Sequence, residues 1–247
     1  MRWRILLGPV FLLLLWWTVT ATGLIRPLFL PSPWQVLTAL SDLTVKGPLL
    51  QDAGATLYRT GAAFCLAAVI GLIIGVPLGV WKGLYESLEV VLDFFRSMPS
   101  PALIPLAMLL LGLGDLSRIA VAAFTCSLVN AIQAAYAVHS VPRHRVLAAR
   151  LAGAKGTFLL THVLMPSVLP GVVAGWRITL SLALIIVVVS EMFIGTRTGL
   201  GMRIYDYHLM FRSADMYAAI FIVGMTGYIL NKALEVTEGH LVHWTGK

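Results

Sequence analysis

Charged residues are scarce in this chain: they account for 12% of its 247 residues, whereas soluble domains carry about 25%. Hydrophobic residues account for 59%, and the mean hydropathy is +0.88. This composition excludes an ordinary soluble domain, because too few polar side chains remain to face water. We therefore expect an all-α integral membrane protein.

The sequence also lacks the motifs of enzymes and of nucleotide-binding proteins. The phosphate-binding pattern G-x4-G-K-[ST] occurs nowhere, and residues 153–157, which read G-A-K-G-T, have a different spacing. The patterns G-x-S-x-G and H-E-x-x-H are absent as well. His240 and His243 lie close together but have no third ligand nearby, so no metal site is expected. We therefore expect a chain that is not an enzyme and that binds no cofactor itself.

Cysteine is rare, since Cys65 and Cys126 are the only two, and both fall within apolar runs. We expect them to be small core residues. A disulfide between them stays open at this point, because it requires a geometry that the sequence does not supply.

Apolar runs of about 20 residues predict membrane-spanning helices. We expect about six, over residues 5–21, 60–80, 101–113, 119–138, 171–194 and 217–234. The third run is too short to cross alone, and Pro99, Pro101 and Pro105 indicate a broken helix, which needs protein or water around it. A signal peptide is the alternative for the first run, but Trp16 and Trp17 favour an interfacial anchor. Because no repeat or long linker divides the chain, we expect one domain over residues 1–247.

The basic residues indicate the orientation in the membrane, since the cytoplasmic side carries the excess. Ten fall on one side: Arg2, Arg4, Lys82, Arg96, Arg143, Arg145, Arg150, Lys155, Lys232 and Lys247. Seven fall on the other: Arg26, Lys46, Arg59, Arg118, Arg197, Arg203 and Arg212. The compact cluster from Arg143 to Lys155 decides the assignment, so both termini and the 139–170 loop are expected in the cytoplasm. The net charge of +7 then reflects topology and anionic lipid rather than a nucleic-acid partner.

Glycine recurs every fourth residue in the second expected span, at Gly71, Gly75, Gly79 and Gly83. Such a small-xxx-small face permits close helix contact, which in lipid depends on van der Waals fit. The partner is either another helix of this chain or a second subunit, and we favour packing within the chain. Pro77 and Gly83 also indicate a bend near the end of this span.

The 139–170 loop contains a polar helix–turn–helix pattern. Its small helix-forming residues let another backbone approach closely; they are Ala148, Ala149, Ala152 and Ala154. Gly153 can end a helical turn or allow a positive φ, and Pro166 is expected to stop the helix that precedes it. The spacing A-A-x3-G-x9-V-x-M-P resembles the cytoplasmic E-A-A-x3-G-x9-I-x-L-P loop in permease subunits of bacterial ABC importers, with Leu147 in place of Glu.

That resemblance implies a type I ABC importer permease fold, in which this loop is a coupling helix that docks on a separate ATPase subunit. The coupling residues would then be Ala148, Ala149, Ala152, Gly153, Ala154, Lys155 and Pro166. ATP and magnesium would be bound by the ATPase chain. The other implied partners are a second copy of this chain, two ATPase subunits in all, a periplasmic or lipid-anchored solute-binding protein and the lipid of the bacterial inner membrane.

A second motif follows the first expected span. Leu30-Pro31-Ser32-Pro33 precedes a short amphipathic segment over residues 34–43, expected to lie on the outer surface. It resembles the L-P-x-P element of taurine, aliphatic sulfonate and nitrate importer permeases, and the resemblance extends to the carboxyl end. A small solute, most simply a sulfonate, nitrate or similar anion, is therefore the expected cargo.

Charged residues at membrane depth are costly and point to function. Arg177 and Glu191 qualify, and their separation places them on nearly the same helix face. The alternative is that both side chains reach the membrane interfaces. Ser190-Glu191-Met192 resembles an A-E-M segment near the mouth of the family's path, and Gly199-Leu200-Gly201 a G-L-G turn after it. We expect Arg177 and Glu191 to line the path. Glu191 would lie in its outer part or gate and hold the gate closed through a hydrogen bond to a second subunit, Arg197 or Arg203.

Residues 96–101 resemble the family's R-P-V-P-P element, which implies that Met98, Pro99 and Pro101 also line the path. A plain helix break is the alternative.

Three other functions stay open: a self-sufficient secondary transporter or channel, an ABC importer of an uncharged vitamin or pyrimidine-like solute, and a membrane scaffold. Few charges lie within the spans and no inverted repeat is present, so the transporter or channel is the weaker interpretation.

Overall fold

The computed structural model describes residues 4–195 and 197–241, and all regular structure in that range is helical. Arg2, Lys247 and His243 lie outside the described residues. Four helical segments are long and apolar enough to cross a membrane: α3 (Leu49–Val80), α6 (Asp115–His139), the continuous segment Gly156–Phe193 that contains α9 (Met165–Phe193), and α11 (Ser213–Leu241). α1 (Arg4–Ala21) is a shorter apolar helix. Each of the six predicted apolar segments is therefore helical.

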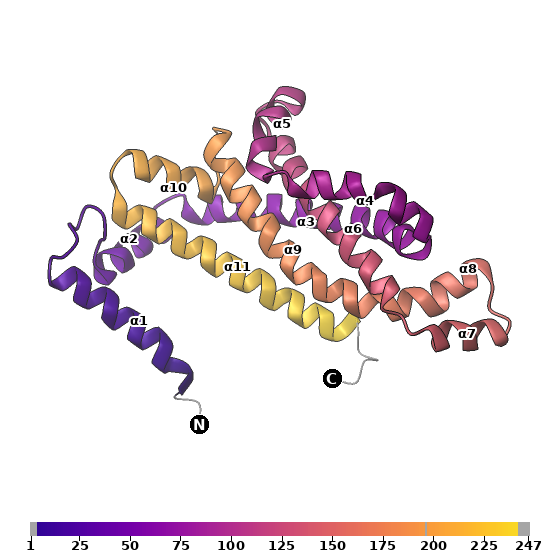
Figure 1. The fold of residues 1–247 in the computed structure, drawn as a ribbon. Helices are drawn as coiled ribbons and strands as arrows, with labels where there is room; N and C mark the ends of the chain where they lie inside the picture. Colours follow the sequence, from indigo (N-terminus) through magenta and orange to yellow (C-terminus); the bar gives the residue numbers. More distant parts are fainter. Residues whose placement is uncertain (1–3, 196, 242–247) are drawn as a thin grey trace.

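The long helices form an elongated bundle with different structures at its two ends (Figure 1). α7 (Arg143–Leu151) and α8 (Gly156–Leu159) extend from one end, which we call the α7 end. α2 (Pro33–Val45) and α10 (Leu200–Leu209) lie at the opposite end, which we call the α10 end. α3, α6 and α9 make the main packed core between the two ends.

The glycine face of α3 packs against α6, which confirms the prediction of contact within the chain. A Cβ at Gly75 would lie 2.3 Å from the carbonyl oxygen of Ala131, and Gly71 and Gly79 approach α6 as closely. Only residues without a side chain let the two backbones meet in this way. Gly83 lies beyond the end of α3 in open space and takes no part in the contact.

The proline-rich connection breaks the third predicted span, as expected. α4 (Lys82–Ser97) is followed by the short 3-10 turn η1 (Ser100–Leu103) and by α5 (Ile104–Leu111). The axes of α4 and of the following helix differ by 89°. α4 itself was not predicted, because its charged residues interrupt the apolar run that a search for spans requires.

α4 runs alongside α6 at the depth of the spans. The ring of Tyr85 lies 6.0 Å from that of His139 at the end of α6, and the ring of Phe95 lies 5.7 Å from that of Phe124 in its middle. Arg96, which we expected on the cytoplasmic surface, therefore lies beside the middle of α6. The charged segment between the two spans is thus a helix packed against α6 rather than a loop.

α2 begins with a complete capping box. The Ser32 hydroxyl accepts from the backbone N–H of Gln35, and the Gln35 side chain accepts from the N–H of Ser32. Trp16 of α1 donates its indole N–H to the Pro31 carbonyl at 3.0 Å, which ties α1 to this turn. The predicted turn and amphipathic helix are thus confirmed. Cys126 is buried, as expected, but Cys65 is exposed, so the prediction of a core position is wrong for Cys65; both are free thiols.

Candidate functional site

α7 ends in a hydrogen-bonded glycine cap. Gly153 has a φ of +91°, one of the two roles that its place in the loop allowed. Its N–H donates to the Arg150 carbonyl at 3.0 Å, and the N–H of Ala154 donates to the Ala149 carbonyl at 2.9 Å. This pair of bonds is the Schellman motif, which satisfies the last carbonyls of a helix and turns the chain sharply.

The α7–α8 segment presents apolar side chains to its surroundings. No residue of α7 is buried, and Leu151 is 89% exposed. Leu147 and Phe158 are also more than half exposed, and the segment extends beyond the end of the bundle (Figure 1). Large exposed apolar side chains that cluster on one projection are typical of a docking surface for another protein.

Pro166 does not stop the helix that precedes it, contrary to our prediction. α8 continues through a π-helical turn, η2 (Leu160–Leu164), directly into α9. The Met165 N–H donates to the Leu160 carbonyl five residues earlier. Because proline has no N–H and its ring crowds the carbonyl four residues back, the wider π turn accommodates it without ending the helix.

A cluster of charged residues lies toward the α10 end, and we call it the ionic cluster; Asp52, Arg59, Arg118 and Glu191 are buried in it, whereas Asp115 is 47% and Arg203 23% exposed. It joins four elements through Asp52, Thr56 and Arg59 of α3, Asp115 and Arg118 of α6, Glu191 of α9 and Arg203 of α10. Its three arginines balance its three carboxylates, so the cluster is neutral as a whole. Charge balance permits four of these charged side chains to be buried together.

Glu191 is completely buried in this cluster. Its carboxylate accepts from Arg59 Nη1 at 2.5 Å, from the Thr56 hydroxyl at 2.9 Å and from the Gly201 N–H at 2.9 Å. Arg59, rather than Arg197 or Arg203, is thus the ion-pair partner that the structure gives to Glu191. The sequence pattern could have indicated Arg59 as a partner, because the spacing of Asp52, Thr56 and Arg59 places all three on one polar face of a helix.

The remaining bonds fasten the segment after α9 to α3 and α6. Arg118 donates to the Ile194 carbonyl at 2.7 Å and to Asp115 at 2.8 Å. Asp52 accepts from the Gly199 N–H at 2.8 Å and from Arg203 Nε at 2.5 Å. The chain between α9 and α10 is therefore held on both sides by charge-assisted hydrogen bonds.

The two glycines of the G-L-G turn make room for the Glu191 carboxylate. Gly199 has a φ of +139°, and a Cβ there would lie 2.6 Å from Glu191 Cδ. A Cβ at Gly201 would lie 2.1 Å from the Val188 carbonyl oxygen. Both positions consequently require glycine, the first for its conformation as well as for space.

Arg177, the other predicted path residue, lies in different surroundings from Glu191. Its guanidinium pairs with Glu238 of α11 at 2.6 Å, and its side chain is 42% exposed. Met98 is half-buried, whereas Pro99 and Pro101 are exposed at the bend between α4 and η1. The five predicted path residues are thus spread along the molecule rather than gathered in one place.

Our sequence reasoning missed the polar face of α4. The charged residues of this helix recur every three or four positions: Lys82, Glu86, Glu89, Asp93 and Arg96. This is the period of an amphipathic helix, so the pattern was present in the sequence. Charges at this depth cost about 2.5–3.5 kcal/mol each in lipid on insertion scales, and they are stable only against water or protein.

Two cavities lie along this face. A large cleft of about 920 Å³ opens at the α7 end between the first turns of α4, the end of α6 and α7. A smaller cavity of about 190 Å³ lies further along α4, between Tyr85, Arg96 and Tyr136. Within the described residues, no group of three histidine, cysteine or acidic side chains is placed to hold a metal ion.

Comparison with known proteins agrees with this architecture. Residues 67–237 match the family model of the binding-protein-dependent transport system inner membrane component. The chain is 31% identical to the taurine transport system permease protein TauC of Escherichia coli K12, over 96% of this chain and 87% of the relative. It is 26% identical to the nitrate import permease protein NrtB of Synechocystis, over 94% and 87%.

Among solved structures, the fold is similar to a chain of the MetNI methionine ABC transporter in an inward-facing conformation. The TM-score is 0.71 at 24% identity, and the match covers 78% of this chain and 95% of the solved chain. At this level of identity the likeness supports the fold alone.

Proposed function

This chain belongs to the binding-protein-dependent transport system inner membrane components, and we propose that two copies of it form the path of an ATP-driven importer. It is the multi-pass permease subunit, and a separate chain hydrolyses ATP. The proposal of two copies rests on the number of membrane-spanning helices. The described residues contain four or five helices long enough to cross a membrane, which are too few to enclose a path in one copy. Twofold symmetry is the usual arrangement of such homo-oligomers.

The observation that carries the proposal is the α7–α8 segment. Its Schellman cap at Gly153, its exposed Leu147 and Leu151 and its projection from the bundle suit a segment that inserts into a cleft on another protein. We assign that cleft to the cytoplasmic ATPase subunits, one for each copy, which would bind ATP and magnesium. Both termini and the α7 end then face the cytoplasm, and the α10 end faces the solute-binding protein.

The cargo in this proposal is a small sulfonate or oxyanion. Two relatives are named for taurine and nitrate, and both match more than nine-tenths of this chain. The chain's own path residues would be those at the α4 bend, Met98, Pro99 and Pro101, together with Arg177. Glu191 would act at the outer gate through Arg59, because its carboxylate is covered by its own chain.

The test is co-purification of the ATPase subunit with Leu151→Asp. Leu151 is almost fully exposed, so the substitution leaves the fold intact while placing a charge on the proposed docking surface. Val45→Asp is the matched control, since Val45 is 78% exposed on α2 at the opposite end. We expect the first variant to lose the ATPase subunit and uptake and the second to keep the ATPase subunit, which is the readout that the control serves. Normal ATPase recovery with Leu151→Asp would contradict the assignment.

A further inference from the structure

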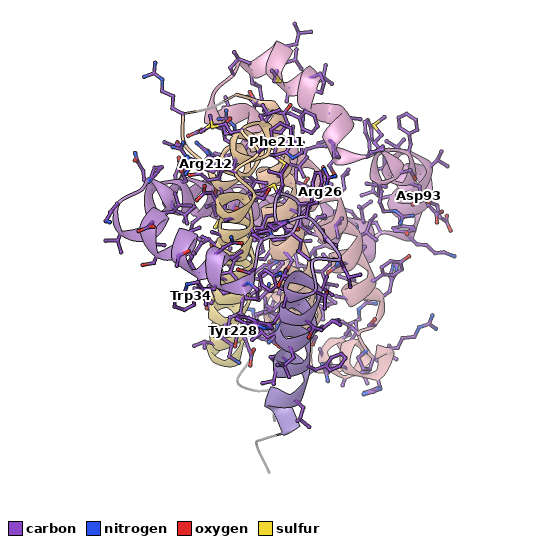
Figure 2. All side chains as sticks on the ribbon, turned by 90° about the vertical axis from the view of Figure 1, so that its left-hand side faces the viewer. Arg26, Trp34, Asp93, Phe211, Arg212 and Tyr228 are labelled. Carbon is purple, nitrogen blue, oxygen red and sulfur yellow. The ribbon has the colours of Figure 1, made fainter. Side chains whose placement is uncertain are left out.

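The polar face of α4 is partly exposed and borders α6 on one side. Seen from the α10 end, Asp93 lies at the edge opposite Trp34 (Figure 2). The side chains of Asp93 and Arg96 are 57% and 55% exposed, although α4 runs beside the spanning helix α6. Charges at this depth are not stable against lipid, so this face borders water. In the proposed dimer, that water is the inner part of the path.

The small cavity between α4 and α6 carries an unbalanced negative charge. Its volume is about 190 Å³, and its lining includes Tyr85, Glu89, Asp93, Arg96 and Tyr136. Asp93 and Arg96 neutralise each other, because Asp93 Oδ1 accepts from Arg96 Nη2 at 3.0 Å and from Nε at 3.3 Å. Among the described side chains, none forms an ion pair or hydrogen bond with Glu89. One carboxylate is therefore left to face the cavity without a counter-ion.

We infer that this cavity takes a small solute that carries an ammonium group. The ammonium supplies the charge that Glu89 lacks, and the two tyrosine rings beside it offer faces that attract a cation. An acid group on the same solute finds Arg96 in the same cavity. A solute that is only an anion meets the Glu89 carboxylate without compensation. The inference rests on the proposed transport function and narrows its substrate class.

The test compares two probes that differ only in the ammonium group, taurine and ethanesulfonate. Binding is measured by saturation-transfer NMR on the permease–ATPase complex in nanodiscs, without a binding protein, so that the permease alone selects the solute. We expect wild type to bind taurine more tightly than ethanesulfonate. Glu89→Gln should weaken taurine binding about tenfold or more, as for loss of a hydrogen bond to a charged group, and strengthen ethanesulfonate binding, because the opposing carboxylate is gone.

Two further variants separate charge from folding. Glu86→Gln makes the same chemical change three residues away, where Glu86 pairs with Lys82 at 3.4 Å and is 60% exposed, and it should bind taurine as wild type does. Glu89→Asp keeps the carboxylate and should keep the preference for taurine. Equal binding of the two probes by wild type, taurine binding unaffected by Glu89→Gln, or no taurine binding at all would each overturn the inference.

The permease–ATPase complex in nanodiscs also distinguishes a failure of the ammonium site from a failure of the proposed transport function. If the ATPase subunit co-purifies and hydrolyses ATP while taurine is not bound, the transport assignment stands and only the ammonium site is wrong. If no ATPase subunit co-purifies with wild type, the transport assignment itself fails.

Discussion

Arg59 Nη1 lies 2.5 Å from Glu191 Oε1, and the two side chains are 3% and 0% exposed. The pair joins α3 to α9 and, through Gly201, to the start of α10. Removing one member of a buried ion pair leaves the other without compensation, at a cost of about 3–5 kcal/mol. The stability of the α10 end therefore depends on these two residues together.

We predict that Glu191→Gln and Arg59→Met each destabilise the folded protein by about 3–5 kcal/mol and that the double variant loses less than the sum. Denaturant titration in mixed micelles measures all three. Glu235→Gln is the control, because Glu235 pairs with Lys232 on an exposed surface and its loss should leave stability nearly unchanged. Strict additivity of the two single changes would show that the pair is not coupled.

The cap of α7 leads to a second prediction, which compares two glycines that differ in φ. Gly153→Ala should cost about 1 kcal/mol locally and reduce ATPase recovery, because Gly153 has a φ of +91° that alanine adopts poorly. Gly83→Ala should be neutral or slightly stabilising, since a Cβ there meets open space inside a helix. Pull-down of the ATPase subunit and hydrogen exchange of residues 143–156 provide the readout. If Gly153→Ala and Gly83→Ala changed ATPase recovery and hydrogen exchange equally, the positive φ would not explain why position 153 carries glycine.

The α3–α6 contact gives a third prediction. Gly75→Ala should destabilise the bundle by about 1–3 kcal/mol, because its Cβ would lie 2.3 Å from a backbone oxygen that cannot move independently. Gly54→Ala in the same helix meets no atom within 4 Å and serves as the control. Thermal unfolding in detergent measures both variants. A variant at Gly75 as stable as the control would mean that α3 and α6 separate easily.

The sequence predicted the features that depend on local pattern. Apolar runs located the spans, the spacing of Gly71, Gly75 and Gly79 indicated a close helix contact, and the residues around Gly153 allowed a positive φ. Partner choice among charges was not predictable in this way. Glu191 pairs with a residue 132 positions earlier, and only the packing of α3 against α9 brings them together. α4 was missed because a search for apolar runs discards a helix whose charged residues recur every three or four positions.

The last prediction concerns Pro166 and the π turn before it. The turn exists because proline removes one N–H and crowds the carbonyl four residues back, so the Met165 N–H reaches back to Leu160. Pro166→Ala restores the donor and permits an ordinary α-helix. One residue then leaves the wide turn, which rotates the α7–α8 segment about the axis of α9 by about 100°.

Because that segment is the proposed docking surface, a rotated segment would meet the ATPase subunit in the wrong orientation. We therefore expect Pro166→Ala to insert and fold normally, to hydrolyse ATP through its ATPase partner, and to lose most uptake per ATP hydrolysed. Pro9→Ala, in the exposed helix α1, is the control. The measurement is solute uptake and ATP hydrolysis in the same proteoliposomes. An unchanged ratio of uptake to ATP hydrolysed would show that the π turn plays no part in coupling ATP hydrolysis to transport.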